Sequence, residues 1–414
     1  MPVSKSSPSK SHWPSANSNP LVRWLKEHPL DGLLLAFPAA LAMRFAEVDD
    51  LWVFIVSGIA IVPLAGLMGR ATESLAATLG SGIGGLLNAT FGNAAELIIA
   101  LIALSKGPQM YPLVKASITG SIIGNVLLVL GLAITLGGFR HSYQHFNRTA
   151  ASMGATLLAL ATVGLIMPTL YYYVFAAAQP LQPGQLATVE FLSEEIAGVL
   201  ALVYVLSLVF MFVTHRKLFD VAHEPAGQTK AEEQLEEEPH WGRGMALAVL
   251  IASTVGVAVV AEMLVASVEA AAHELGMSQV FVGVVVVAII GNAAEHSTAV
   301  LVALKNKMDL SVNIAVGSGI QVALFVAPAL VFASMFMGHE RTLDLHFTPM
   351  EIVAVIASIA ILALVAQDGE SHWLEGVMLL AVYAILALAF YHLGDLAPPE
   401  LPGAMLPPTP ALHP

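Results

Sequence analysis

The sequence predicts an all-α polytopic membrane protein with eleven transmembrane helices, arranged as one N-terminal helix followed by two inverted five-helix repeats. Three observations lead to this prediction. Hydrophobic residues make up 57% of the 414 residues and charged residues only 11%, against about 25% charged residues in soluble domains. Apolar stretches close to the roughly 20 residues that a bilayer requires recur along the chain. The motif GNAAE occurs twice, at residues 92–96 and 291–295.

The apolar stretches define the expected helices in order. They are expected at residues 30–45, 51–68, 85–104, 112–137, 150–170, 195–213, 245–265, 279–304, 311–337, 350–366 and 373–392. The positive charges then orient the chain, because short cytoplasmic loops collect Lys and Arg. With a cytoplasmic N-terminus, thirteen of the seventeen Lys and Arg residues fall on the cytoplasmic side, and only Arg44, Lys106, Lys115 and Arg341 fall on the other side. An odd number of spans places the C-terminus opposite the N-terminus.

Polar segments divide the chain into units. Residues 1–29 are rich in Ser and Pro and are expected to be a disordered cytoplasmic tail, with no cleaved signal peptide. The extra helix at 30–45 precedes a first repeat at 51–213. An acidic cytoplasmic linker at 214–244 separates it from the second repeat at 245–392, and a Pro-rich tail follows at 393–414. The linker is interpreted as a solvated segment, with cation sensing as the alternative.

Composition also excludes several classes of protein. The formal net charge of −13 disfavours nucleic-acid binding. The absence of cysteine excludes disulfides, thiolate metal sites and cysteine nucleophiles. The glycines in GSGIGG match a dinucleotide-binding pattern, but no strand precedes them, so no cofactor is expected. The expected partners are small cations and the lipid bilayer, and the oligomeric state is left open.

The two halves repeat each other beyond GNAAE. ATESLAATLG at 71–80 corresponds to SVEAAAHELG at 267–276, the two GNAAE motifs lie 199 residues apart, and GSIIGN at 120–125 corresponds to GSGIQ at 317–321. Because five helices per half is an odd number, the second copy enters the membrane inverted. Secondary transporters with this plan bind their substrates near the midplane, between the repeats.

Glu96 and Glu295 lie inside apolar spans, where an ionised side chain is costly. In a helix, the asparagine three residues before each glutamate shares its face. A membrane glutamate beside an asparagine can also form a simple hydrogen bond between helices, but two matched copies favour one oxygen-rich cation site. The glycine that begins each motif is expected to open the helix there. The expected site comprises Asn93, Asn292, Ser121, Ser318 and Gln321 as further ligands, with Gly92 and Gly291 as the opening positions and Asn125 as an additional oxygen source.

Four more polar residues could lie on a proton or ion pathway. Glu73, Glu262 and Glu269 lie in or near the helices next to the motifs, where a solvated carboxylate is the alternative interpretation. His296 follows Glu295 directly and either relays protons or plays a structural role. The second motif therefore differs from the first, in which Leu97 follows the glutamate.

These motifs resemble the calcium/proton exchanger family of the calcium/cation antiporter superfamily. The resemblance rests on ATESLAATLGSGIGGLLNATFGNAAELI at 71–98, VFVGVVVVAIIGNAAEHSTAV at 280–300, GSGIQVALFVAP at 317–328 and GESHWLEGVMLLAVYAILALAFY at 369–391. It implies an eleven-helix exchanger in which Glu96 and Glu295 are the central calcium ligands and proton acceptors. The related sodium/calcium exchangers resemble a version with proline before the acidic residue, where this chain has Ala95 and Ala294. The resemblance therefore favours protons as the counter-ion.

The expected function is secondary active exchange of calcium for protons by alternating access. Two facing carboxylates in a low-dielectric site repel each other, so they bind either protons or one divalent cation. Sodium- or potassium-coupled calcium exchange is the near alternative. A cation channel and an intramembrane enzyme are more distant alternatives, and no catalytic residue is expected. The compact chain suggests a prokaryotic cytoplasmic membrane, with the vacuolar membrane as the alternative.

Overall fold

The computed structural model describes residues 29–79, 81–178, 183–215 and 241–394. Apart from their edge residues, the expected N-terminal tail, acidic linker and C-terminal tail lie outside the described residues. Apart from turns and loops, the described residues form helices and one antiparallel pair of two-residue strands, β1 (Gln144–His145) and β2 (Glu370–Ser371). The prediction of an all-α protein is therefore confirmed.

Helices follow one another through both halves of the chain. The first half contains η1 Pro29–Leu35, α2 Ala36–Phe45, α3 Asp50–Leu79, α4 Ser81–Phe91, α5 Ala94–Ser105, η2 Pro108–Met110, α6 Tyr111–Ile123, η3 Gly124–Val129, α7 Leu130–Gly138, α8 Arg148–Ala178, α9 Pro183–Val209 and η4 Phe210–Thr214. The second half contains α11 Arg243–Glu274, α12 Gln279–Phe281, η7 Val282–Val287, α13 Ala288–Leu304, α14 Met308–Gln321, η8 Val322–Val326, α15 Ala327–Phe336, α16 Pro349–Val365 and α17 Trp373–Leu393.

Within the described ranges, eight helices are long and apolar enough to cross a bilayer, counting a helix with its π-helical continuation as one. They correspond to eight of the eleven expected spans. The other three expected spans coincide with shorter elements: η1 with α2, the interrupted pair α4 and α5, and α16. The total of eleven membrane crossings therefore stays a prediction.

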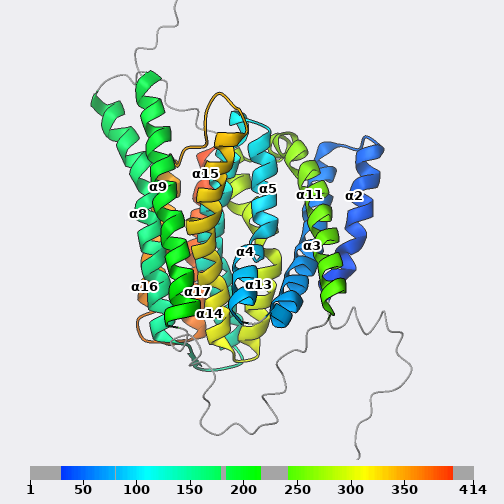
Figure 1. The fold of residues 1–414 in the computed structure, drawn as a ribbon, viewed down its shortest axis with the longest axis vertical. Coiled ribbons are helices and arrows are strands. Elements are labelled where there is room, and N and C mark those ends of the chain that lie inside the picture. The colour runs from blue at the N-terminus through cyan, green and yellow to red at the C-terminus, as the bar shows by residue number, and fades with distance from the viewer. Residues whose placement is uncertain (1–28, 80, 179–182, 216–240, 395–414) are drawn as a thin grey trace, which may run out of the picture.

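The helices stand roughly side by side in Figure 1, with α2, α3 and α11 at one side of the molecule and α8 and α9 at the other. Helix α11 packs most extensively against α3. A small buried cluster of Ala40, Val53 and Met263 joins α2 to this pair. The ion pair between Arg70 and Asp31, at 2.8 Å, fastens η1 to α3.

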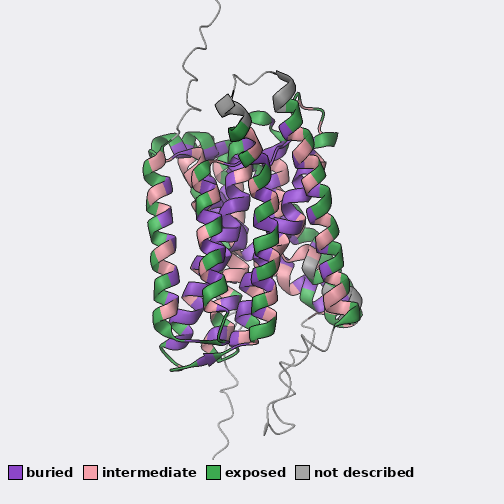
Figure 2. Cartoon of the chain, turned by 90° about the vertical axis from the view of Figure 1, so that its left-hand side faces the viewer, coloured by how far each residue is buried: buried purple, intermediate pink, exposed green. Residues whose placement is uncertain are grey.

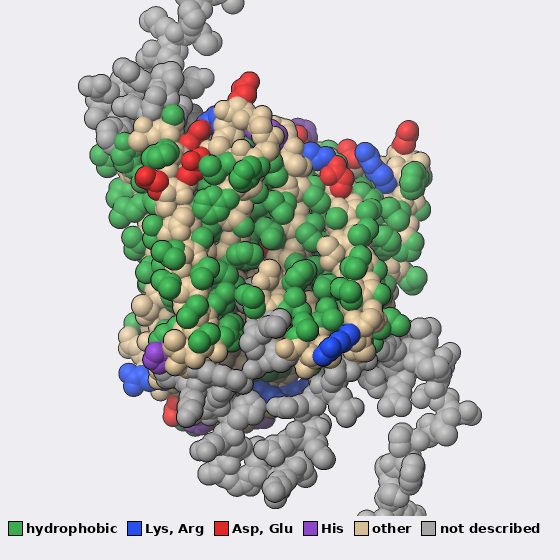
Figure 3. Space-filling model, in the orientation of Figure 1, with side chains coloured by type: hydrophobic (Ala, Val, Ile, Leu, Met, Phe, Trp, Pro, Cys, Tyr) green, Lys and Arg blue, Asp and Glu red, His purple; other side chains and the backbone are tan. Residues whose placement is uncertain are grey.

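Burial follows the pattern expected of a helical bundle in lipid. In Figure 2 buried residues occupy the interior of the bundle and exposed ones its outer faces. Hydrophobic side chains cover the middle of the face shown in Figure 3, whereas charged side chains gather towards its two ends. Large apolar side chains such as Phe45, Leu35 and Phe336 are more than three-quarters exposed. In water this surface would be unstable, but in a bilayer it faces hydrocarbon.

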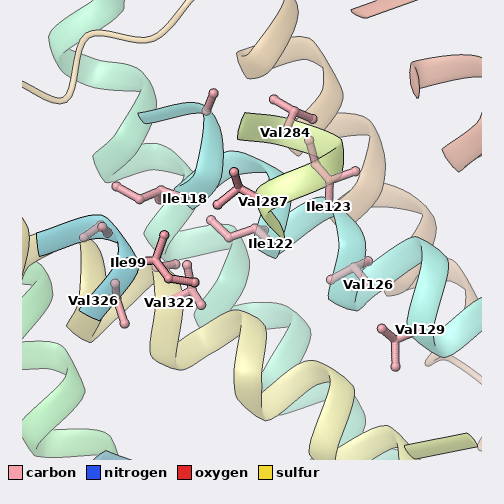
Figure 4. Close-up of a cluster of buried hydrophobic side chains, with 14 of the residues drawn as sticks. Ile99, Ile118, Ile122, Ile123, Val126, Val129, Val284, Val287, Val322 and Val326 are labelled. Atoms are coloured by element: carbon pink, nitrogen blue, oxygen red, sulfur yellow. The ribbon is translucent and has the colours of Figure 1, made fainter. Parts of the chain in front are cut away.

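The centre of the bundle is packed with β-branched and other aliphatic side chains. Figure 4 shows Ile99 of α5, Ile118 and Ile122 of α6, and Val284 and Val287 of η7 within one cluster. Glycine makes the α6–η7 crossing close, because a Cβ at Gly283 would lie 2.9 Å from the carbonyl oxygen of Leu113. Such small-residue crossings let helix backbones approach closely in membranes. Helices α5 and α6 of this cluster also carry polar residues of the site described next.

Candidate functional site

The first motif lies at a break between two helices. Helix α4 ends at Phe91, Gly92 and Asn93 form a turn, and α5 begins at Ala94. The side chain of Asn93 does not cap α5; it is directed to other groups instead. Glu96 lies in the first turn of α5, where the positive end of the helix dipole favours a negative charge. The chain thus leaves the helical conformation at Gly92, where the sequence suggested an opening.

The second motif differs from the first, because α13 runs from Ala288 to Leu304 without interruption at Gly291. The expectation that Gly291 opens its helix does not hold in this structure. The irregular part comes earlier, in the π-helical turn η7. Gly291 instead provides room: a Cβ there would lie 3.0 Å from Cγ of Glu96. Glycine is needed at this position for close approach rather than for a change of backbone conformation.

The two motifs cross each other at the centre of the bundle. The side chain of Glu96 lies over Gly291, and a Cβ on Gly92 would lie 3.2 Å from Oε1 of Glu295. Each glutamate therefore lies against the glycine of the other motif. Glu96 is 7% exposed, whereas Glu295 is partly exposed. The structure thus brings together the two carboxylates that the sequence separates by 199 residues.

Two donors from different halves hold Glu96. The hydroxyl of Ser121, on α6, donates to Oε1 of Glu96. Nδ2 of Asn292, on α13, lies 2.6 Å from the same oxygen and 3.1 Å from Oγ of Ser121. The second oxygen of Glu96 has no partner among the described residues. One carboxylate oxygen is therefore fixed by both halves and the other is available.

A second hydrogen-bond network surrounds Asn93. Its Nδ2 donates to Oε1 of Gln321 at 2.7 Å, and its Oδ1 accepts from Oγ of Ser318 at 2.9 Å. Nδ2 of Asn125 donates to the same Ser318 oxygen at 2.9 Å. The Ser318 hydroxyl also lies within hydrogen-bonding range of Glu295. Because Ser318 has a single hydrogen to donate, Asn93 and Glu295 compete for it.

Both networks lie where the helices are irregular. The π-helical segment η3 begins three residues after Ser121, and η8 begins immediately after Gln321. π-helical turns occur frequently at functional sites. The buried oxygens Glu96 Oε2, Glu295 Oε2 and Asn125 Oδ1 have no described partner. Two carboxylates and six amide or hydroxyl groups therefore lie together, and such oxygen-rich groups suit a hard cation.

The described residues contain no group of three or more His, Cys, Asp or Glu side chains arranged to hold a metal ion. The ligand set therefore has two carboxylates and otherwise neutral oxygens. Fewer charged ligands lower the affinity for a divalent cation.

The remaining predicted residues lie outside these two networks. Glu73, Glu262 and Glu269 are exposed on α3 and α11. Glu262 pairs with Lys106 at the end of α5, and Glu269 accepts a hydrogen bond from Gln279 at 3.3 Å. His296 is partly buried beside Glu295, and its Nε2 has no described partner.

Sequence reasoning missed a second polar cluster, formed by Lys115 of α6 and Asp344 and His346 of the loop before α16. The sequence did contain one sign of this cluster, because Lys115 is a charged residue within the apolar span 112–137. Its carboxylate partner lies 229 residues away, so its identity could not be read from the sequence.

Comparison with known proteins identifies the family. Residues 50–213 and 245–392 match the family model described as "Sodium/calcium exchanger protein". The chain is 45% identical to the "Ca(2+)/H(+) antiporter" of Synechocystis over 87% of this chain and 96% of that one. It is 43% identical to the "Ca(2+)/H(+) antiporter ChaA" of Bacillus subtilis, over 82% and 91%. It is 39% identical to the "Vacuolar calcium ion transporter" of Schizosaccharomyces pombe, over 87% and 84%.

Solved structures agree with this relationship. The structure of native YfkE aligns with a TM-score of 0.72 at 37% identity, covering 88% of this chain and 99% of that chain. The H+/Ca2+ exchanger CAX aligns with a TM-score of 0.60 over 89% of this chain and 92% of that chain, but at 14% identity it supports the fold alone. With its two motifs crossing in the bundle and its matches extending through both halves, the chain belongs to the sodium/calcium exchanger protein family, among the calcium/cation antiporters.

Proposed function

We propose that this protein exchanges calcium for protons across a membrane by alternating access, with Glu96 and Glu295 binding either Ca²⁺ or H⁺. The observation that carries the proposal is the crossing of the two motifs, in which each glutamate lies against the other motif's glycine. The relatives named as Ca(2+)/H(+) antiporters, at 43–45% identity, support calcium and protons as the substrates.

The electrostatics of two neighbouring carboxylates, one buried and one partly exposed, supply the coupling. In a low-dielectric site two negative charges without a counter-charge are unstable, so each carboxylate takes up a proton or both bind one divalent cation. Calcium and protons therefore exclude each other from the site. If the site changes its exposure only when it is occupied, this exclusion becomes coupled exchange. Two glutamates make two protons per calcium the simplest stoichiometry.

The neutral groups complete the proposed calcium shell. Calcium binds six to eight oxygens at about 2.3–2.6 Å in flexible arrangements, more than the two carboxylates supply. The carboxamide oxygens of Asn93, Asn292 and Gln321 and the hydroxyls of Ser121 and Ser318 are the proposed additional ligands. In this structure the same groups donate to Glu96 and to each other. Calcium binding would therefore replace hydrogen bonds with oxygen–calcium contacts within one set of residues.

The architecture proposed for this mechanism is one extra helix followed by two inverted five-helix repeats, giving eleven crossings with the N-terminus in the cytoplasm. The matched positions of the two motifs and of η3 and η8 support it. Glu73, Glu262 and Glu269 are proposed to line the approaches to the site, and His296 to handle protons beside Glu295. A prokaryotic cytoplasmic membrane is the proposed location, and the relatives include a vacuolar protein.

A flux assay in liposomes tests the function. Purified protein is reconstituted with a calcium indicator inside, and a pH gradient is imposed. Calcium entry should follow the pH gradient, and it should be abolished in Glu96→Gln and Glu295→Gln, because an amide carries no charge to exchange. Thr156→Ala, which removes an exposed hydroxyl of α8 bonded only within its own helix, is the matched control. Normal exchange in either glutamate variant would refute the site.

Sodium-coupled calcium exchange is the second candidate, because the matched family model carries the sodium/calcium exchanger description. A sodium gradient replaces the pH gradient in the presence of a proton ionophore. Calcium uptake under this condition would favour sodium as the counter-ion. Calcium movement with no counter-gradient at all would instead indicate a channel.

A further inference from the structure

The segment between α15 and α16, residues 339–348, crosses one end of the bundle and is called the strap here. It has no regular secondary structure, yet alternate residues Leu343, Leu345 and Phe347 are at most 2% exposed. Their backbone N–H groups donate to hydroxyls on three different helices: Leu343 to Ser334 at 2.8 Å, Leu345 to Ser193 at 3.0 Å and Phe347 to Thr169 at 2.9 Å. The strap is therefore fixed to α15, α9 and α8.

Helix α6 is attached to the same strap along one of its faces. Tyr111, Lys115 and Thr119 are spaced four residues apart, so their side chains lie on one face of the helix. The Tyr111 hydroxyl donates to the carbonyl of Arg341 at 2.7 Å. Thr119 donates to Glu351, in the first turn of α16, at 2.9 Å.

Lys115, the middle one of these three residues, forms an ion pair with the strap. Nζ of Lys115 donates to Oδ1 of Asp344 at 2.9 Å and to the carbonyl oxygen of His346 at 2.8 Å. The two charged side chains are 15% and 9% exposed. Without Asp344, Lys115 would keep only the His346 carbonyl, and without Lys115, Asp344 would keep only Arg341 at 3.6 Å and the backbone N–H of His346. Removing one member of a buried ion pair is destabilising. The pair therefore resists separation of α6 from the strap.

The same positions in the second half carry no such bonds. When GSIIGN is aligned with GSGIQ, the residues equivalent to Tyr111, Lys115 and Thr119 in the second half are Met308, Val312 and Val316. These three α14 residues are apolar and at most 4% exposed. Apolar packing is non-directional and tolerates sliding better than a buried ion pair does. The polar attachment is thus specific to α6.

The other side of α6 meets the second motif. A Cβ at Gly283 of η7 would lie 3.2 Å from the backbone nitrogen of Ser117, and η7 leads directly into α13. Further along α6, Ser121 donates to Glu96. Helix α6 therefore stands between the strap on one side and η7 on the other, and it supplies a hydroxyl to the central site.

We propose that Lys115 is a positioning residue, because it fixes α6 to Asp344 and His346 of the strap. In this way it keeps in place both the face of α6 against which η7 packs and the Ser121 hydroxyl that bonds Glu96. Lys115 does not touch the transported ion. The part of the inference that concerns transport rate rests on the proposed exchange function, whereas the part that concerns η7 packing does not.

Cysteine labelling tests the packing directly, because the chain contains no cysteine. Ser117→Cys places one thiol of similar size on the α6 residue whose backbone nitrogen lies at the η7 contact, and Ser117 is 8% exposed. In detergent, the thiol should react slowly with a maleimide. Adding Lys115→Met should accelerate labelling by roughly tenfold or more, because local opening exposes the contact. Lys115→Arg, which keeps the charge and the donors, should label at the original rate.

Calcium flux in liposomes supplies the second readout. Lys115→Met should lower the maximal rate by roughly tenfold, a size typical of coupling between sites, and Lys115→Arg should restore most of it. Glu190→Gln is the matched control, because it removes the more exposed ion pair of Arg341 and leaves the bonds of Lys115 intact. That control should retain wild-type flux and labelling.

Two results would overturn the proposal: unchanged labelling in Lys115→Met, or wild-type calcium flux in that variant despite accelerated labelling. If Lys115→Met does not fold, Asp344→Asn takes its place, because it removes the ion pair but keeps the His346 carbonyl as an acceptor. It should accelerate labelling to an intermediate rate, and an unaltered rate would likewise refute the role. Failure of wild-type calcium/proton exchange would refute the proposed function but leave the labelling result valid.

Discussion

Nδ2 of Asn292 lies 2.6 Å from Oε1 of Glu96, which joins the second motif to the glutamate of the first. The same amide lies 3.1 Å from the Ser121 hydroxyl, so one carboxamide orients two groups of the proposed site. Loss of this hydrogen bond should therefore impair transport.

Asn292→Ala should lower calcium flux by about tenfold or more, since it removes both a donor to Glu96 and a proposed ligand of calcium. A hydrogen bond to a charged group contributes about 1.5–3 kcal/mol, which supports a change of that size. The measurement is the initial rate of pH-driven calcium uptake over a range of calcium concentrations. Asn292→Asp is a useful comparison with Asn292→Ala, because it keeps the side-chain oxygen but adds a third acidic group to the site. Full activity in Asn292→Ala would contradict the proposed role.

Gly291→Ala should impair transport without preventing folding. The new methyl would lie 3.0 Å from Cγ of Glu96, so the glutamate must shift, and overpacking of this kind costs about 1–3 kcal/mol. Gly198→Ala, on α9, is the matched control because nothing lies within 4 Å of the added methyl. We expect lower apparent calcium affinity in Gly291→Ala only. Equal affinities in the two variants would argue against close approach at Gly291.

Gly283→Ala should lower thermal stability. Its Cβ would lie 2.9 Å from the Leu113 carbonyl oxygen, and backbone atoms cannot move aside as a flexible side chain can. We expect η7 and α6 to separate at a cost of about 1–3 kcal/mol, measured as a lower Tm of the purified protein. Gly317→Ala, with nothing within 4 Å of the added methyl, serves as the reference. A Tm equal to the reference would show that the crossing is looser than it appears.

The strap should make folding stability sensitive to acid through His346. Burial, followed by the positive charge of Lys115, lowers the pKa of His346 from 6.5 to about 4, although Asp344 acts in the opposite direction. Because the unfolded chain binds this proton more readily than the folded protein, stability should fall as the pH drops from about 6.5 towards 4.

Asp344 does not explain loss of stability in that range. Burial alone would raise the pKa of Asp344, but the charge and hydrogen bond of Lys115 hold it below its usual value. The carboxylate therefore stays ionised until more acidic pH, where its own contribution to stability is lost as it becomes protonated.

His346→Phe tests the assignment, because phenylalanine preserves the stacking on Tyr172, whose ring centroid lies 4.0 Å away. The Tm of this variant should decline less than that of the wild type between pH 6.5 and 4. His145→Phe, at an exposed position, should follow the wild-type curve. Identical curves for His346→Phe and the wild type would exclude His346 as the acid-sensitive group.

The sequence by itself determined the membrane class, most helices, the repeated motifs and the family. Hydrophobic length and composition suffice for this, because a bilayer requires apolar helices whose backbone groups are satisfied internally. Glu96, Glu295 and their neighbouring asparagines were recognisable because a carboxylate inside an apolar span needs an explanation, and two matched copies supply one.

Only the tertiary structure decided which groups meet. The helix is interrupted at Gly92 but continues through Gly291, although the five residues GNAAE are identical in the two copies. Local sequence cannot distinguish these outcomes, because the difference depends on the helices packed against each motif. The pairing of Lys115 with Asp344 likewise depends on how the strap crosses α6. Hydrogen bonds and ion pairs between distant residues are fixed by packing, which composition and periodicity do not encode locally.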